Sequence, residues 1–172
     1  MKKTIDIEFE KAVRILAQHL PVSVEGSRKP VLFHDIRVGV YLYERNYSCD
    51  IVLAGVLHDT LEFSTITEDM LTDEFGENVL KIVKANSKDR SIQDPDERIE
   101  ELIKRCANAG QDALIVKAAD TLDSFKHYTK TGNQSELEYC TKTTNAIFKY
   151  LPEDYDNKVF EELRKFIINK AG

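Results

Sequence analysis

Apolar residues recur at spacings of three and four along nearly the whole chain, and alternation of apolar with polar residues is nowhere sustained. This spacing is typical of amphipathic helices, whose buried face returns every 3.6 residues. Glycine, proline and capping residues divide the pattern into separate segments. The sequence therefore predicts an all-α fold, a compact single-domain helical bundle of eight or nine helices that covers residues 1–172.

Several polar residues indicate where these helices begin and end. Thr67 is expected to cap a short helix, because its hydroxyl can accept from free backbone N–H groups. Asp94 followed by Pro95 is typical of a helix N-terminus. Gly132 is expected to end a long helix, and residues 22–30 are expected to form a polar loop. The predicted helices cover about 9–20, 32–45, 49–58, 68–74, 77–84, 95–106, 112–128, 135–150 and 155–169.

Composition narrows the class of protein. The chain is 42% hydrophobic and 31% charged, which is typical of a soluble globular protein. Its net charge of −6 argues against a nucleic-acid polymer as partner, because such partners require a basic surface. A few local cations are still enough to bind one small phosphorylated ligand.

The sequence also predicts a location. No apolar run approaches the length that spans a bilayer, and the charged start argues against a secretory signal. Cys49, Cys106 and Cys140 are odd in number and include no C-x-x-C pair, so neither a disulfide framework nor a zinc knuckle is expected. We therefore expect a cytoplasmic protein with no membrane contact, whose cysteines are small buried hydrophobes.

Three apolar runs end in residues that a core would exclude. They end in His34-Asp35, in His58-Asp59 and in Asp120. A buried carboxylate or imidazole costs several kcal/mol unless it is paired, hydrogen-bonded or bound to metal. Because the same residue types recur at three such places, the pattern indicates a shared purpose.

Metal binding would supply that purpose. His34, His58, Asp59 and Asp120 form a mixed nitrogen and oxygen set, which suits Mn²⁺, Fe²⁺ or Mg²⁺. Neighbouring residues of a helix point about 100° apart, so His58 and Asp59 can reach one ion if it lies off the helix end. From the residues alone a second interpretation stays open, in which the histidines belong to the core and the aspartates cap helices or form salt bridges.

The order His34, His58-Asp59, Asp120 resembles the H…HD…D signature of the HD-domain superfamily of metal-dependent phosphohydrolases. Within that superfamily, four segments look like the hydrolase domain of the bifunctional RelA/SpoT alarmone enzymes and the small Mesh1-type alarmone hydrolases. These segments are 29–34, 53–62, 75–79 and 115–122, and the similarity covers about 29–126.

The resemblance implies an HD-type fold and a specific chemistry. That branch removes the 3′-pyrophosphate from guanosine tetra- or pentaphosphate, usually with Mn²⁺. It implies His34, His58, Asp59 and Asp120 as metal ligands, Asp59 and Glu62 as catalytic groups, and a small phosphorylated nucleotide as partner. Glu62 lies four residues after His58, on the same helical face if the helix continues, so it can orient or deprotonate water.

The chain departs from the alarmone pattern in three places. Phe63 replaces an acid that follows Glu62 in the resembling enzymes. Asp123-Ser124 replaces a histidine and an asparagine. The stretch 17–19 lacks an arginine-lysine pair, for which Arg28 and Lys29 are the possible substitutes.

The substrate and the activity therefore stay open. The residues expected to bind substrate are Arg28, Lys29, Arg37, Lys88 and Ser124, whereas the run 97–104 is expected to be an exposed helix face. A nucleotidase or phosphodiesterase of the same superfamily is one alternative. A degenerate HD domain that serves as a ligand-binding or regulatory module is another. Retention of all four ligands and Glu62 favours an enzyme.

Overall fold

The structure is a computed structural model that describes residues 4–23, 28–153, 155 and 157–168. The described residues form ten helices and no strand, so the prediction of an all-α fold is confirmed. The helices are α1 (Ile5–His19), α2 (Val31–Glu44), α3 (Cys49–Leu57), α4 (Thr60–Phe63), α5 (Glu68–Phe75), α6 (Glu77–Asn86), α7 (Pro95–Ala109), α8 (Gln111–Thr131), α9 (Gln134–Tyr150) and α10 (Lys158–Ile168).

Nine of these helices correspond to the predicted segments, and α4 is an additional turn of four residues. The first helix begins at Ile5, earlier than expected, because Ile5 packs against the core and acidic residues in the first turn favour a helix N-terminus. The eighth continues to Thr131, where Gly132 adopts a left-handed conformation with φ of 70°. Part of the expected loop, 24–27, lies outside the described residues.

The two predicted helix caps are present. The Thr67 hydroxyl accepts from the backbone N–H of Met70 at 3.2 Å. The Asp94 carboxylate accepts from the N–H groups of Asp96 and Glu97, both at 2.9 Å. These local interactions start α5 and α7 where the sequence indicates.

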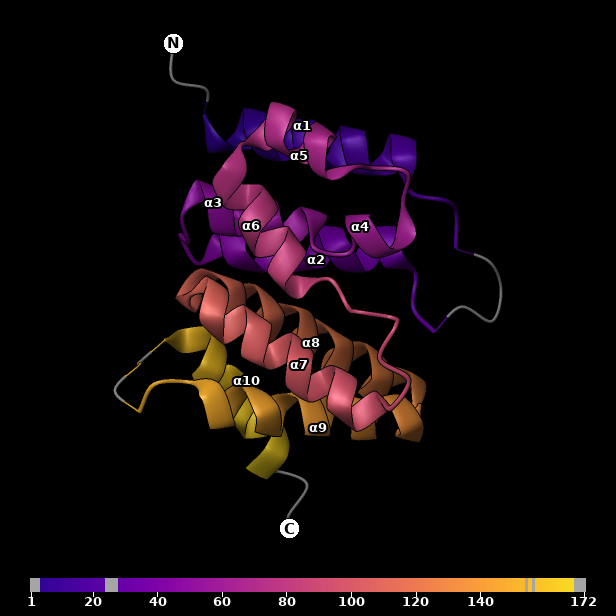
Figure 1. Ribbon diagram of the computed structural model, residues 1–172, viewed down its shortest axis with the longest axis vertical. Helices are drawn as coiled ribbons and strands as arrows, with labels where there is room; N and C mark the ends of the chain where they lie inside the picture. The colour runs from indigo at the N-terminus through magenta and orange to yellow at the C-terminus, as the bar shows by residue number, and fades with distance from the viewer. Residues whose placement is uncertain (1–3, 24–27, 154, 156, 169–172) are drawn as a thin grey trace.

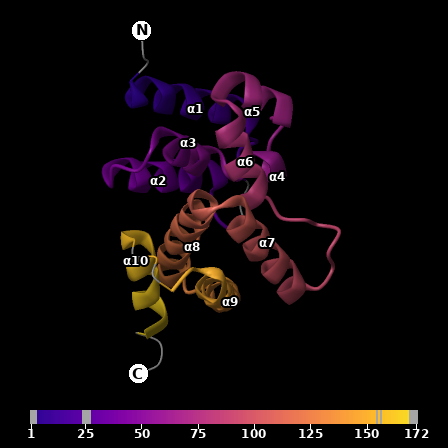
Figure 2. The ribbon, with the colours of Figure 1, turned by 60° about the vertical axis from the view of Figure 1, so that its left-hand side comes forward.

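The helices form two groups that meet in the middle of the molecule (Figure 1). Helices α1 to α6 lie on one side and α7 to α10 on the other, and Figure 2 shows the same division from a second direction. Helix α8 contacts α2, α3 and α6 of the first group and α7, α9 and α10 of the second. The boundary between the groups is therefore formed largely by α8.

Helices α2 and α3 approach each other closely. A Cβ atom on Gly39 would overlap the side chain of Val56, and one on Gly55 would overlap that of Leu42. All residues of α3 from 51 to 57 are buried. This close approach at two glycines holds α2 against α3, and both helices contact α8.

Two further predictions concern the cysteines and membrane spans. Cys106 and Cys140 are buried and Cys49 is half-buried, and none of them forms a disulfide within the described residues. Across the described part of the chain, no helix combines the length and apolar character that a bilayer crossing requires. The cytoplasmic location stays a prediction from the sequence.

Candidate metal centre and cavity

Three helices bring the predicted metal ligands together. His34 belongs to α2, His58 directly follows α3, and Asp120 belongs to α8. The Nε2 atom of His34 lies 3.0 Å from Asp120 Oδ1. The Nε2 atom of His58 lies 3.6 Å from Asp59 Oδ1 and 3.7 Å from Asp120 Oδ1. Because α3 ends at Leu57, the shared space lies off the helix end, as the spacing of His58 and Asp59 requires.

The His58 side chain presents one unpaired nitrogen to this space. Its Nδ1 atom donates to the carbonyl oxygen of Gly55 at 2.8 Å, while Nε2 is buried without a hydrogen-bond partner. Burial lowers the pKa of His58, but the carboxylates of Asp59 and Asp35 outweigh it and raise the pKa to about 9. Both facts favour a positive charge at Nε2, so the residues present fit a divalent cation.

The Nδ1 side of the His34 ring, opposite the candidate metal site, contacts an ion pair. Its Nδ1 atom lies 2.6 Å from Asp123 Oδ2, and Arg37 binds both oxygens of Asp123 at 2.8 and 2.7 Å. Burial alone would raise the pKa of Asp123, but the hydrogen bonds from His34 and Arg37 hold it below its usual range. Hydrogen bonds of this kind fix the orientation and tautomer of a metal-binding histidine.

This arrangement gives Arg37 a different position from the expected one. Arg37 was expected to bind substrate, but its guanidinium is engaged by Asp123 and its side chain does not line the cavity described below. Asp123, which the sequence marked only as a departure from the family pattern, contacts a predicted ligand directly. The signal for this contact was the three-residue spacing from Asp120, which places both carboxylates on one face of α8.

The ammonium group of Lys29 lies among the same ligand atoms. It is 2.7 Å from His34 Nε2, 3.4 Å from Asp120 Oδ1 and 3.0 Å from Ser124 Oγ. Lys29 and Ser124 therefore both lie beside the candidate ligands, and their predicted role in substrate binding stays a prediction. The contact of Lys29 with Nε2 requires a lone pair there, which agrees with a proton on Nδ1 facing Asp123.

A second buried lysine supports Asp120. Lys117 is only 3% exposed, and its Nζ atom lies 2.9 Å from Asp120 Oδ2. Burial lowers the pKa of Lys117, but the charge of Asp120 outweighs it and raises the pKa. Lys117 was not among the predicted site residues, although a lysine inside an apolar run, three residues before Asp120, was the available signal.

Glu62 does not lie on the helix that precedes His58, where it was expected. The helix does not continue past His58, because α3 ends at Leu57 and a separate turn, α4, carries Glu62. The Oε1 atom of Glu62 accepts from the backbone N–H of Lys88 at 2.9 Å. Its Oε2 atom is buried without a hydrogen bond, with Arg90 Nη2 at 3.5 Å. A contact with the segment after α6 therefore positions this carboxylate.

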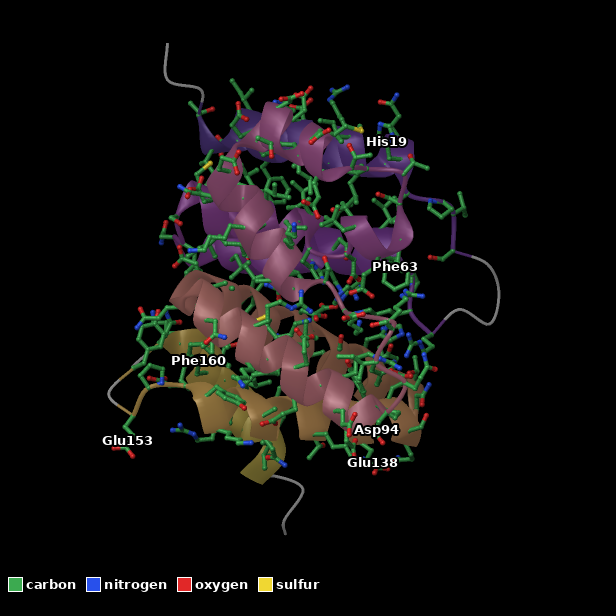
Figure 3. The ribbon with its side chains drawn as sticks, in the orientation of Figure 1. His19, Phe63, Asp94, Glu138, Glu153 and Phe160 are labelled. Carbon is green, nitrogen blue, oxygen red and sulfur yellow. The ribbon has the colours of Figure 1, made fainter. Side chains whose placement is uncertain are left out.

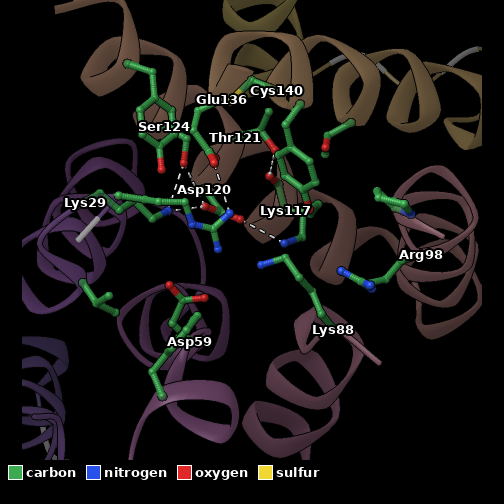
Figure 4. A pocket seen from close by; sticks show the side chains of 17 residues that line it. Lys29, Asp59, Lys88, Arg98, Lys117, Asp120, Thr121, Ser124, Glu136 and Cys140 are labelled. Atoms are coloured by element: carbon green, nitrogen blue, oxygen red, sulfur yellow. Dashed lines mark hydrogen bonds and ion pairs between the residues drawn. The ribbon is translucent and has the colours of Figure 1, made fainter. Parts of the chain in front are cut away.

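A cavity of about 350 Å³ opens beside Asp59 and Asp120. Figure 4 shows Lys88 and Lys117 pointing into it from different segments, with Asp59 and Asp120 on facing sides. Phe63 also lines it and lies between the two helix groups in Figure 3. The basic side chains that line the cavity are Arg28, Lys29, Lys88, Arg98 and Lys117.

Two of these basic residues bear on the predictions. Arg28, predicted to bind substrate, lines the cavity, with its guanidinium 3.1 Å from Glu136. Arg98 belongs to the run 97–104, for which an exposed face was predicted. That prediction is wrong for Arg98, which lines the cavity, and for Ile99 and Leu102, which are buried. The reason is that α7 packs on α8 and α9, so its apolar face is covered.

The centre combines two imidazoles with several buried carboxylates, and it lies beside a cavity lined by cationic side chains. This combination is typical of helical proteins that bind a metal ion and phosphate ligands. The sequence profile of the HD domain family matches residues 12–153. This chain belongs to the HD domain family, as the H…HD…D signature indicated.

Known proteins similar to this chain agree with that assignment. The chain is 27% identical to a guanosine-3′,5′-bis(diphosphate) 3′-pyrophosphohydrolase of Aquifex aeolicus, over 99% of this chain and 32% of the relative. It is 32% identical to a probable enzyme of the same name from Mycoplasma pneumoniae, over 58% of this chain and 15% of the relative. The chain therefore spans about a third or less of the length of these curated relatives.

Two solved structures share the fold. One is a metazoan orthologue of SpoT described as hydrolysing ppGpp and acting in starvation responses, with a TM-score of 0.73, 19% identity, and coverage of 95% of this chain and 96% of that one. The other is a Listeria monocytogenes EGD-e protein with a TM-score of 0.67, 19% identity, and coverage of 86% and 96%. At this identity the likeness concerns the fold.

Proposed function

We propose that this chain is a metal-dependent phosphohydrolase that removes the 3′-pyrophosphate from guanosine 3′,5′-bis(diphosphate) or a closely related small nucleotide. The observation that carries the proposal is the convergence of five basic side chains on a cavity that Asp59 and Asp120 also line. Its volume of about 350 Å³ lies in the range of small-molecule sites. The names of the Aquifex and Mycoplasma relatives support this substrate.

His34, His58, Asp59 and Asp120 are the residues proposed to hold the metal ion. Mn²⁺ is the ion we propose, with Fe²⁺ and Mg²⁺ as alternatives, because the set combines imidazole with hard carboxylate oxygens. A bound divalent ion polarises a phosphoryl oxygen and lowers the pKa of a bound water.

The cations of the cavity are proposed to bind the phosphates. Negative charge increases on the phosphoryl oxygens during transfer, and fixed positive groups stabilise it. Lys117 is suited to this because its contact with Asp120 holds it in place before substrate arrives. Lys88, Arg98, Lys29 and Arg28 contribute further charge around the cavity.

Glu62 is proposed to take the proton from the attacking water. The backbone N–H of Lys88 holds one carboxylate oxygen, which leaves the buried Oε2 atom as the acceptor. Lys88 Nζ lies 3.7 Å from Oε1 and Arg90 Nη2 lies 3.5 Å from Oε2, so two cations flank this carboxylate.

The test is hydrolysis by the purified protein with Mn²⁺, followed by chromatography of the guanosine products and a pyrophosphate assay. Asp59→Asn should abolish turnover, and Glu62→Gln should lower kcat about 10²–10⁴-fold, the usual contribution of general base catalysis. Glu68→Gln, which changes an exposed carboxylate paired with Lys84, is the matched control and should leave kcat unchanged. Absence of pyrophosphate release with Mn²⁺, Fe²⁺ and Mg²⁺ alike would refute the alarmone substrate.

One observation favours a second candidate, an HD-family nucleotidase or phosphodiesterase. Phe63 lines the cavity where the resembling enzymes carry an acid, and its ring lies 5.1 Å from the Arg90 guanidinium. An aromatic ring cannot transfer a proton, so a cavity lined by Phe63 favours a substrate whose hydrolysis does not need a second acid at this position. Assays with nucleoside monophosphates, nucleoside triphosphates and a cyclic dinucleotide would identify it. Ligand binding without turnover in any assay would indicate a regulatory module instead.

A further inference from the structure

Asp35 is a buried carboxylate that neither the predicted ligand set nor the proposed mechanism uses. It follows His34 in α2 and is 0% exposed. Neither of its oxygens has a hydrogen-bond partner among the described residues. An unpaired buried carboxylate costs several kcal/mol, and buried carboxylates of this kind are usually paired with a cation or bound to a metal ion.

The neighbouring groups of the protein do not supply the missing partner. The Oδ1 atom of Asp35 lies 3.8 Å from His58 Nδ1, too far for a hydrogen bond, and that nitrogen donates to the Gly55 carbonyl instead. The ammonium of Lys29 is hydrogen-bonded to His34, Asp120 and Ser124. The Asp35 oxygens are therefore left without a donor at the edge of the centre.

Asp35 lies close to three of the proposed ligands. One atom from each of His34, Asp35, His58 and Asp59 can be chosen so that all four lie within 4.8 Å of one another, and all four residues are buried. Opposite ligands of an ion with bonds of about 2.1 Å lie about 4.2 Å apart. Small side-chain shifts would bring these four atoms around one ion.

We propose that Asp35 is a further ligand of the divalent cation, an inference that rests on the proposed metal centre. The set then contains two imidazoles and the carboxylates of Asp35, Asp59 and Asp120. A third carboxylate makes the site harder and raises the number of ligands above four. Such a site favours six-coordinate Mn²⁺ or Mg²⁺ over Zn²⁺, which is usually four-coordinate.

The experiment compares Asp35→Asn, Asp35→Ala and the unchanged chain by isothermal titration calorimetry with Mn²⁺ and Zn²⁺. Asparagine keeps one weak oxygen ligand and alanine keeps none. Mn²⁺ affinity should therefore fall at least about tenfold in Asp35→Asn and further in Asp35→Ala. Zn²⁺ affinity should fall less. Asp73→Asn, at an exposed position of α5, is the matched control and should bind both ions normally.

Stability without metal is the second measurement. With a chelator present, Asp35→Asn should unfold at no lower a temperature than the unchanged chain, because the Asp35 oxygens have no hydrogen-bond partner to lose. A lower unfolding temperature would indicate a structural role. If alanine prevents folding, the asparagine variant still decides the question.

The outcomes separate this inference from the proposed function. Unchanged Mn²⁺ affinity in both variants would overturn the role of Asp35 and leave the metal centre standing. Equal losses of Mn²⁺ and Zn²⁺ affinity would also overturn it, since a charge that acts through space weakens both ions alike. No binding of any divalent ion by the unchanged chain would refute the metal centre itself.

Discussion

The ion pair behind His34 can be tested by replacing Asp123 with asparagine. Asp123 Oδ2 accepts from His34 Nδ1 and from Arg37 Nη2, while Oδ1 accepts from Arg37 Nε. An asparagine that keeps its carbonyl oxygen at the Oδ2 position retains the first two contacts. Its amide group then faces the Nε–H of Arg37, so that one hydrogen bond is lost together with the negative charge.

The magnitude follows from these contacts. A hydrogen bond to a charged group contributes about 1.5–3 kcal/mol, and the lower end applies because the Arg37 side chain is 32% exposed. For a chain of this length, 1 kcal/mol corresponds to about 2–4 °C, so unfolding should occur about 3–6 °C lower. Loss of a partner of this kind lowers metal affinity about 10–100-fold, so Mn²⁺ should bind at least about tenfold more weakly.

Three measurements check this expectation. Thermal unfolding with a chelator reports the stability, and calorimetry reports the Mn²⁺ affinity. Nitrogen-15 NMR of the histidine rings should show His34 with its proton on Nδ1 in the unchanged chain. In Asp123→Asn the ring should keep this tautomer, because the amide carbonyl oxygen still accepts from Nδ1, but the Nδ1 chemical shift should change as a neutral acceptor replaces the carboxylate.

The control is Asp96→Asn, which removes an exposed aspartate from its pair with Lys142. Exposed pairs contribute about 0–1 kcal/mol, so this variant should unfold and bind Mn²⁺ nearly as the unchanged chain does. If Asp123→Asn behaved like Asp96→Asn in all three measurements, the reasoning about the His34 support would be refuted.

Three further outcomes are expected. Lys29→Met should bind Mn²⁺ about tenfold more tightly by calorimetry, because its ammonium no longer competes for His34 Nε2; weaker binding would contradict this. Phe63→Asp should release pyrophosphate from guanosine 3′,5′-bis(diphosphate) faster than Phe63→Leu, and equal rates would mean that the missing acid does not limit the reaction. The raised pKa of His58, about 9 against 6.5 when unfolded, stabilises the metal-free protein fully below pH 6.5 and is lost as the pH rises through 9. The unfolding temperature in chelator should therefore fall over that interval, more than in His58→Gln.

Much of the fold was predictable because it depends on local interactions. The three- and four-residue apolar spacing indicated eight or nine helices, and the caps at Thr67 and Asp94 act within four residues of themselves. The exceptions are also local. The sequence did not reveal the break after His58, where the Thr60 hydroxyl donates to the carbonyl of Leu57 and begins a new turn at α4.

Some residues of the candidate centre were also predictable from the sequence, and others were not. His34, His58, Asp59 and Asp120 were selected as candidates because a polar group at the end of an apolar run is costly without a partner, and the resemblance to the HD-domain superfamily favoured metal binding over the alternative. The roles of Arg37, Lys117 and Arg98 were not recognisable. Each is an ordinary surface-type residue, and only its neighbours in space distinguish it.

Those neighbours come from distant parts of the chain. Arg37 reaches Asp123 across 86 positions, and Lys29 reaches Asp120 across 91. Helical periodicity assigns a residue to a face of its own helix, but it does not specify which other helix that face meets. The sequence by itself determined the helices and the candidate ligands, because both follow from local spacing and the cost of burial. The packing of α8 against α2 and α3 decided which charges surround the ligands, and hence what supports each of them.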